Sequence, residues 1–485
     1  MSVPFFFKST LRIFILCVIT LLLLSVNSQI HAQTQVRILK SDQLMGADTD
    51  QGPIRKMIGN VELQTEDLHL FADSAYQYLE IDLVEAFGNI EIITERQRLW
   101  SDKVRYNTST DESTFIGRVV IVTDNATIFS EEAGYDFTFE IATFPSKVRF
   151  EDEKGTLIAE SGMYFNVLNQ ASFRGNIQLS DSTQYAEADS LFAIRNDNYY
   201  ELHENVYIHD LENNSRLIGD YVESDSTGFR QISGNARVQR VSKNETDTTM
   251  IQAARFDILD REPNRIMNAF KNVEIWSEKY ASLSDTTIYY DSKDEFHLIG
   301  NTRLWRNDLQ LTSPKSLIFL IDDEIDNLES YTRPFVVFPD SITNRLNQIE
   351  GDTLRIWFSE NEMKQLVMQP NSELIYHARD DNDEPESSIQ LTSQFISMFF
   401  SEGDIDSLRI LESIEGQYIP EVQNPAEIRL AGFVYTPDER PSKPEKWLLP
   451  RFEPIPEELP FPLPTRYLEY LRLQEEERQA EEIDD

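Results

Sequence analysis

The sequence predicts an elongated all-β protein built from repeats of about 29 residues. Three observations support this fold class. A short segment in which glycine precedes asparagine recurs at a nearly constant interval, and the residues after it alternate between apolar and polar. The stretch between two copies has room for short strands but not for a helix as well. We therefore expect stacked repeats that bury a continuous core, which no single repeat could bury alone.

The repeat is easiest to align on the residue that follows the glycine. Most copies are 29 residues apart, one step is 30, and a step of 37 contains the polar segment Val241–Thr249, which we interpret as an inserted loop. The nine alignment positions are Asn60, Asn89, Arg118, Lys147, Asn176, Asn205, Asn235, Asn272 and Asn301. Glycine precedes six of them, which is typical of a bulge or of a corner with positive φ, where a Cβ atom would clash.

The residues after each alignment position predict a strand with one buried face. The third residue after it is apolar in all nine copies and the second is mostly polar, which is the period of two expected for a strand. The predicted inward-pointing residues are Leu63, Ile92, Ile121, Phe150, Leu179, Ile208, Val238, Ile275 and Leu304. The residues that precede them, such as Glu91 and Arg149, are expected to face water.

A second segment recurs about a dozen residues after each early alignment position. Phe71–Asp73 and Trp100–Asp102 share this offset, and a tyrosine such as Tyr106 follows a few residues later. We therefore expect two or three short strands in each repeat, with glycine and asparagine at the corners.

The pattern divides the chain into four regions. Residues 1–32 contain a charged start, a short apolar run and a small residue at the end, which predicts a cleaved signal peptide and export. Residues 36–330 form the main β-repeat domain, and residues 331–435 form a degenerate continuation of it. Residues 436–485 form a proline-rich acidic tail, within which Thr465–Ala480 is predicted to be either a short helix or a disordered segment.

Charge and cysteine content restrict the function. The chain has 84 acidic and 44 basic residues, a formal net charge of −40, and such a surface repels phosphate backbones, which argues against nucleic-acid binding. It also argues against electrostatic adhesion to an anionic membrane. The single cysteine, Cys17, lies in the predicted signal peptide, so we expect neither disulfides nor thiol chemistry in the mature chain.

Two architectures fit about 29 residues per repeat. One is a closed parallel β-helix with a dry interior, and the other is an open, twisted jelly-roll in which two sheets face each other across a groove. The periodicity alone does not distinguish them.

The repeat unit resembles the organic-solvent-tolerance (OstA-like) family, which includes the periplasmic lipopolysaccharide-transport bridge LptA and the N-terminal domain of LptD. The segments in which the resemblance lies are Met57–Leu63 with Leu70–Tyr76, Phe87–Ile92 with Trp100–Tyr106, Arg174–Leu179, and Ile299–Leu304. The resemblance covers residues 36–330 well and residues 331–420 weakly. The proline-rich tail departs from the family pattern, so the chain looks like a stand-alone OstA-like protein.

The resemblance implies an open β-jelly-roll whose apolar groove holds the acyl chains of lipopolysaccharide or a similar glycolipid. The nine inward-pointing residues would line this groove. It further implies a periplasmic location in a Gram-negative bacterium, with association to the outer membrane as a further expectation. The implied partners are Lpt-type transport components at either end, or further copies of the chain joined end to end. It implies no enzymatic activity and no cofactor.

Two other functions fit the same sequence. A structural or adhesive β-solenoid on the cell surface would have the same repeats with a fully packed interior. A β-helix enzyme acting on polysaccharides would need clustered acid and base groups, but no acidic motif stands out from the repeat, and no P-loop, G-x-S-x-G or metal-binding H-E-x-x-H motif is present. The six histidines are expected at surface or turn positions.

Overall fold

The computed structural model describes residues 35–484, except 213, 242–247, 262, 322–323, 360–361, 402–403, 424, 444–454 and 457. The predicted signal peptide, residues 1–32, lies outside the described residues. The chain forms two compact units, which are described separately here. Among the described residues, unit 1 consists of those in 35–122, 134–139 and 463–484, and unit 2 consists of those in 123–133 and 140–462.

Unit 1 contains the first strands and the C-terminal helix. Its elements are β1 (Arg37–Lys40), β2 (Gln43–Thr49), β3 (Gly52–Gln64), β4 (His69–Tyr78), β5 (Leu83–Ile93), β6 (Gln97–Asn107) and helix α2 (Thr465–Asp484). Strands β7 (Glu112–Thr123) and β8 (Thr127–Asp136) contribute residues to both units. Strands β3 to β6 pair with one another consecutively, and each pairing is antiparallel.

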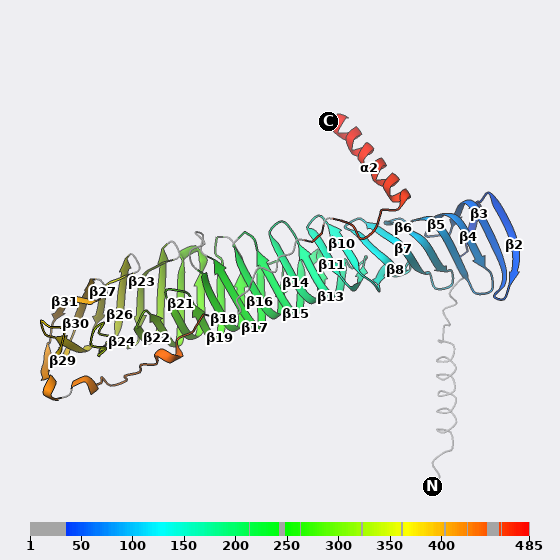
Figure 1. The fold of residues 1–485 in the computed structure, drawn as a ribbon. Helices are drawn as coiled ribbons and strands as arrows, with labels where there is room; N and C mark the ends of the chain where they lie inside the picture. Colours follow the sequence, from blue (N-terminus) through cyan, green and yellow to red (C-terminus); the bar gives the residue numbers. More distant parts are fainter. Residues whose placement is uncertain are drawn as a thin grey trace, which may run out of the picture. The chain divides into compact units, whose positions relative to one another are not determined.

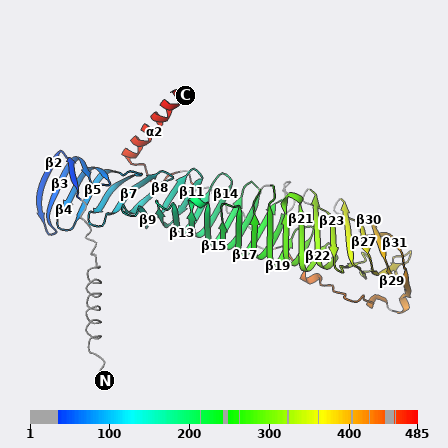
Figure 2. The same ribbon diagram turned by 180° about the vertical axis from the view of Figure 1, so that it is seen from behind.

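Unit 2 contains the remaining strands, whose order can be followed by the labels in Figures 1 and 2. The strands that follow β8 up to β22 are β9 (Ile141–Phe144), β10 (Val148–Asp152), β11 (Gly155–Ala159), β12 (Ser161–Phe165), β13 (Gln170–Ser180), β14 (Gln184–Ile194), β15 (Tyr199–Asp210), β16 (Ser215–Ser224), β17 (Phe229–Val241), β18 (Thr248–Leu259), β19 (Ile266–Trp276), β20 (Ala281–Tyr290), β21 (Glu295–Arg306) and β22 (Leu309–Ile321). Pairings among the described strands are antiparallel, which excludes the parallel β-helix that the sequence left open.

Each long strand is bent near its middle, at the glycine–asparagine pair. Strand β5 pairs with β6 up to Phe87, skips two residues, and resumes pairing at Ile90. The skipped residues Gly88 and Asn89 have φ values of +72° and +44°. The predicted bulge with positive φ is therefore confirmed, and it turns the strand from one sheet into another.

An acidic side chain of the preceding strand fills the space beside the bend. Asn89 Nδ2 donates to Asp73 Oδ2 at 2.9 Å, and a Cβ atom on Gly88 would lie 2.4 Å from the same oxygen. The equivalent acid–amide or acid–guanidinium pairs are Asp42–Asn60, Asp102–Arg118, Glu160–Asn176, Asp189–Asn205, Asp220–Asn235, Asp285–Asn301 and Asp352–Asn371. The two recurring sequence segments are thus the two sides of one bend, and this pairing explains why both recur with the same period.

The bend divides each strand into halves that belong to two sheets. The strand halves before the glycine–asparagine pair, such as Gln170–Arg174, form one sheet, which we call sheet I. The strand halves after the pair, such as Ile177–Ser180, form the other sheet, which we call sheet II. The inner faces of the sheets pack together, since Phe150 of sheet II lies 5.4 Å from the ring of Tyr164 and 5.9 Å from the ring of Phe173, both in sheet I. The fold is the all-β jelly-roll expected from the resemblance. Most repeats hold two long bent strands instead of the short strands predicted, because the predicted strands are halves of one strand.

After β22 the bent strand is replaced by two separate strands. Sheet I continues as β23 (Glu324–Tyr331), β26 (Thr353–Ser359), β27 (Glu362–Gln369), β30 (Phe395–Ser401) and β31 (Asp404–Leu411). Sheet II continues as β24 (Phe335–Pro339), β25 (Leu346–Glu350), β28 (Ser372–Arg379), β29 (Pro385–Ser393) and β32 (Glu415–Pro420).

The segment after β32 contains the short 3-10 helices η3 (Glu421–Gln423), η4 (Pro425–Glu427) and η5 (Pro437–Glu439). The sequence predicts either a short helix or a disordered segment near the end of the tail, and the structure shows a helix there, α2. In the described part of the chain, no helix is both long and apolar enough to cross a membrane.

Candidate functional site

The nine predicted groove residues all belong to sheet II and point into the interior of their unit. Eight of them are buried, and Leu179 is half-buried. Phe150 and Leu179 line a cavity that we call cavity A, and Val238 lines a second one, cavity B. The other six pack among neighbouring side chains and line neither cavity.

Cavity A lies between the sheets of unit 2 and has a volume of about 260 Å³. Its apolar wall consists of Phe150, Leu157, Ala171, Phe173, Leu179, Ala186, Leu191, Ala193 and Leu202. The space exists because small residues line it: Ala171 of β13 and Ala186 and Ala193 of β14 face the cavity from two adjacent strands. Alanine leaves room that a leucine would fill.

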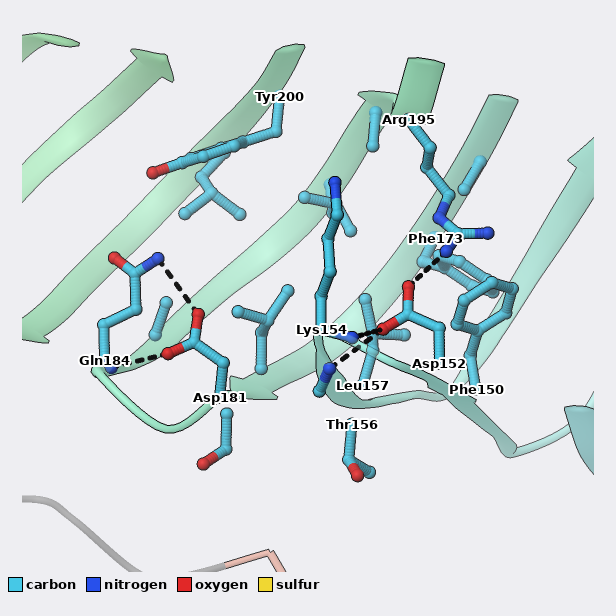
Figure 3. Close-up of a pocket in the computed structure, with 18 of the residues that line it drawn as sticks. Phe150, Asp152, Lys154, Thr156, Leu157, Phe173, Asp181, Gln184, Arg195 and Tyr200 are labelled. Carbon is cyan, nitrogen blue, oxygen red and sulfur yellow. Dashed lines mark hydrogen bonds and ion pairs between the residues drawn. The ribbon is translucent and has the colours of Figure 1, made fainter. Parts of the chain in front are cut away.

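The rim of cavity A is polar and connects the two sheets (Figure 3). The guanidinium of Arg195, which begins the 3-10 helix η1 (Arg195–Asp197) directly after β14, forms an ion pair with Asp152 at the end of β10 and lies 5.1 Å from the centre of the Phe150 ring. The Lys154 ammonium donates to Asn198 Oδ1 across the same opening. Arg195 and Asp152 are only 15% and 11% exposed, so this pair closes part of the opening instead of lying on the open surface.

The surroundings of Arg195 hold it over the cavity. Its Nη1 atom donates to Asn169 Oδ1 at 3.3 Å and contacts the Tyr164 hydroxyl at 3.5 Å. Burial raises the pKa of Tyr164, so this hydroxyl stays protonated at neutral pH. Asp152 is fixed in turn by the backbone N–H groups of Lys154 and Gly155, at 2.7 and 2.9 Å. The cation therefore has a defined position beside an apolar space.

Cavity B repeats this arrangement further along unit 2 and has a volume of about 490 Å³. Val238, Ile251 and Phe296 belong to its apolar wall. At its rim, Arg240 donates to the Tyr289 hydroxyl, and that hydroxyl donates to Asp294 at 2.8 Å. Burial raises the pKa of Tyr289 far above its usual value.

Both cavities combine an apolar wall with arginine at the rim. An alkyl chain gains about 0.8 kcal/mol per buried methylene, and a rim guanidinium can pair with a carboxylate or phosphate. About 260 Å³ is close to the lower end of ordinary ligand pockets, roughly 300–1,000 Å³. Cavity A therefore suits part of one acyl chain with an anionic head group at its opening.

The outer face of sheet II differs from the sequence expectation. In unit 1, Glu91 on this face forms an ion pair with Arg466 of α2 at 3.4 Å. The neighbouring Trp100 is fully buried beneath Tyr467 and Tyr470, whose ring centres lie 4.9 and 5.2 Å away. The prediction that this face is exposed to water is therefore wrong here, because the C-terminal helix covers it.

The C-terminal segment also contacts the outer face of sheet II within unit 2. Arg149 Nη1 donates to the Pro456 carbonyl oxygen at 2.5 Å, and Arg303 forms an ion pair with Glu439. Both arginines occupy the repeat position that was predicted to face water. These two residues of the polar row thus hold the returning tail, a role that their local sequence does not reveal.

No cluster of histidine, cysteine and carboxylate side chains suited to a metal ion occurs among the residues with a described position. One histidine contradicts the expectation of surface or turn positions: His377 of β28 is 1% exposed, and burial lowers its pKa to about 4. Its Nδ1 atom lies 2.5 Å from Ser388 Oγ. It is a neutral core residue at physiological pH.

Comparison with known proteins supports the resemblance. A family model described as OstA-like protein matches residues 33–189 of this 485-residue chain. The predicted resemblance is therefore confirmed over that region, which includes cavity A's first strands. No curated protein matches the chain. The OstA-like family is a transport and binding family, and the match indicates a general involvement in lipid or lipopolysaccharide transport.

Proposed function

We propose that this protein is a periplasmic carrier of lipopolysaccharide or a similar glycolipid, and that it holds acyl chains between sheets I and II. In this proposal the chain is exported by the signal peptide at residues 1–32 and acts as a bridge or chaperone on the way to the outer membrane. It performs no chemical reaction. The observation on which the proposal mainly depends is the combination of an apolar interior cavity with a fixed arginine at its opening, in an OstA-like region.

The free strand edges support partners at the ends of the units. In unit 1, the described pairings of β2 involve only β3, and Leu44 and Met45 of β2 are 58% and 45% exposed. In unit 2, β31 and β32 are the last strands of their sheets in the described pairings, and Tyr418 of β32 is 61% exposed. Such edges accept a further strand by backbone hydrogen bonds. They suit Lpt-type components or a further copy of the chain.

The lipid proposal can be tested by filling cavity A. Replacing Ala186 by leucine places three additional carbon atoms in the cavity, so we expect at least tenfold weaker binding of a fluorescent acylated glycolipid with little change in stability. The control is Ala142→Leu, at a buried position outside both cavities, which should cost about 1–3 kcal/mol by overpacking but leave the affinity of the folded protein unchanged. Equal binding by the Ala186 variant and the wild type would contradict the proposal.

The head-group part of the proposal has its own test. Arg195→Met keeps most of the apolar stem and removes the charge. A charge-assisted hydrogen bond contributes about 1.5–3 kcal/mol, so binding of a phosphorylated glycolipid should weaken roughly 10- to 100-fold. Binding of an uncharged monoacylglycerol of the same chain length should not change. Equal losses for both ligands would show that Arg195 acts only on the structure of the opening.

A structural β-solenoid remains the second candidate, because six of the nine predicted groove residues pack away from the cavities. Ile92 and Ile275, for example, are completely buried. A scaffold of this kind would bind no acyl ligand in either titration, and its stability would respond to Ala186→Leu as it does to Ala142→Leu.

A further inference from the structure

The segment that follows β32 turns back along unit 2 and lies on the outer face of sheet II. In both views of the molecule it runs beside the strands from β29 towards β22 (Figures 1 and 2). We call residues 428–443 the strap. Leu430 of the strap is 4% exposed and packs against Phe335, Val337 and Ile375, which belong to β24 and β28. The outer face of these strands is therefore as buried as their inner face.

Two buried glutamines hold the backbone of the strap. Gln348 Nε2 donates to the Ile428 carbonyl at 3.0 Å, and its Oε1 accepts from the Leu430 N–H at 2.9 Å. Gln310 Nε2 donates to the Val434 carbonyl at 2.9 Å, and its Oε1 accepts from the Thr436 N–H at 2.7 Å. Both glutamines are 0% exposed.

The geometry of these contacts is that of peptide recognition. Each amide binds the carbonyl of one strap residue and the N–H of the residue two positions later, which is how a neighbouring strand would bind an extended chain. Yet the strap contains no described strand and pairs with none. Side-chain amides thus take the place of the backbone ladder that joins the strands of sheet II.

Charged groups fix the strap at both ends. Before it, Arg345, which directly precedes β25, forms an ion pair with Glu421. At its far end, Arg303 binds Glu439, and Lys443 lies 3.6 Å from Glu278. The strap is therefore held by an apolar centre, two amide clamps and ionic contacts on either side.

We propose that the outer face of β22, β24, β25 and β28 is a binding site for an extended peptide, and that the strap is its ligand, held within the same chain. The partner that this site fits is a peptide with apolar residues at the spacing of Ile428, Leu430, Phe433 and Tyr435. The inference is independent of lipid binding, because the site lies on the opposite face of sheet II from the cavities.

The test separates the strap from the chain without removing it. Recognition sites for a specific protease are inserted at residue 424, between η3 and η4, and within residues 444–454 of the full chain. After folding and cleavage, only non-covalent contacts hold the strap. We expect it to stay bound through gel filtration and to exchange slowly with an added synthetic peptide of residues 426–443, but not with a peptide of the same composition in scrambled order.

Two variants identify the basis of the binding. The double variant Gln310→Met, Gln348→Met keeps the side-chain volume and removes four hydrogen bonds, so the cleaved strap should dissociate at least roughly thirty-fold faster. The control Gln365→Met, in sheet I, should not change dissociation, because Gln365 bonds to Ser397 and not to the strap. Release of the wild-type strap on cleavage would overturn the proposal. So would a strap that stays bound equally well in the double variant, with circular dichroism confirming that each cleaved protein remains folded.

Discussion

Replacing Gly88 by alanine tests the bend on which the whole fold depends. Gly88 has φ of +72°, where a residue with a Cβ atom is strained, and that Cβ atom would lie 2.4 Å from Asp73 Oδ2. Asp73 would have to move, and its hydrogen bond from Asn89 Nδ2 would be lost. The substitution thus affects the backbone and the acid–amide pair at once.

The expected cost follows from these two contributions. A left-handed backbone conformation costs an L-residue about 1–2 kcal/mol, and loss of the hydrogen bond costs about 0.5–1.5 kcal/mol. Gly88→Ala should therefore destabilise the bend by about 2–3 kcal/mol. Asp73→Ala alone should cost about 1 kcal/mol, and the double variant should cost less than the sum, because the clash is already absent.

Hydrogen exchange followed by mass spectrometry measures this effect locally, in the peptides that contain the bend. Peptides covering β4 and β5 should exchange roughly 30- to 150-fold faster in Gly88→Ala. The control is Gly46→Ala in β2, where φ is not positive and no atom lies within 4 Å of the added Cβ. Similar exchange in both variants, or costs in the double variant that simply add, would refute this account of the bend.

Three further predictions concern other parts of the chain. Burial lowers the pKa of His377 to about 4 in the folded protein, so below about pH 6.5 this histidine takes up a proton in the unfolded chain but not in the folded one. The free energy of unfolding, measured with urea, should therefore fall by about 1 kcal/mol from pH 7.0 to pH 5.5. His377→Asn should remove that part of the slope, and an unchanged slope would show that this histidine is not the cause. Tyr467→Ala should release helix α2 from Trp100 and expose the helix to proteolysis. The control Leu473→Ala, at a 46% exposed position, should not increase proteolysis. Equal proteolysis of the two variants would contradict the packing of α2 on Trp100. Ile121→Asp should unfold its repeat, because it places a charge at a 1% exposed position. Leu179→Asp changes the half-buried edge of cavity A and should keep the circular dichroism spectrum of the wild type. Unfolding by both variants would mean that cavity A is a packed core.

The bends and the buried row were accessible from the sequence because they depend on local rules. Glycine before Asn89 required a positive φ, and the period of two placed Ile92 in the interior. The partner of the bend was also present in the sequence, since the acidic residue Asp73 stands 16 residues before Asn89, an offset that most of the equivalent pairs share. Its meaning appears only when strand pairing brings it beside the glycine.

The cavity and the strap could not be derived in the same way. Cavity A arises where alanines of two adjacent strands, such as Ala171 and Ala186, lie in the two sheets that face each other, and no local pattern indicates such a coincidence. Gln310 has a polar side chain, and its residue type gives no sign that it is completely buried beneath the strap. The one available signal was the uninterrupted apolar run Phe335–Phe338, which indicates a strand buried on both faces.

Native mass spectrometry of the full chain, purified gently from a host with an outer membrane, tests the central claim most directly. Our account predicts a bound glycolipid of the lipid A type in the wild type, and loss of that mass in Ala186→Leu but not in Ala142→Leu. A mass equal to that of the protein alone, unchanged when lipopolysaccharide is added, would contradict the carrier function and favour a structural scaffold.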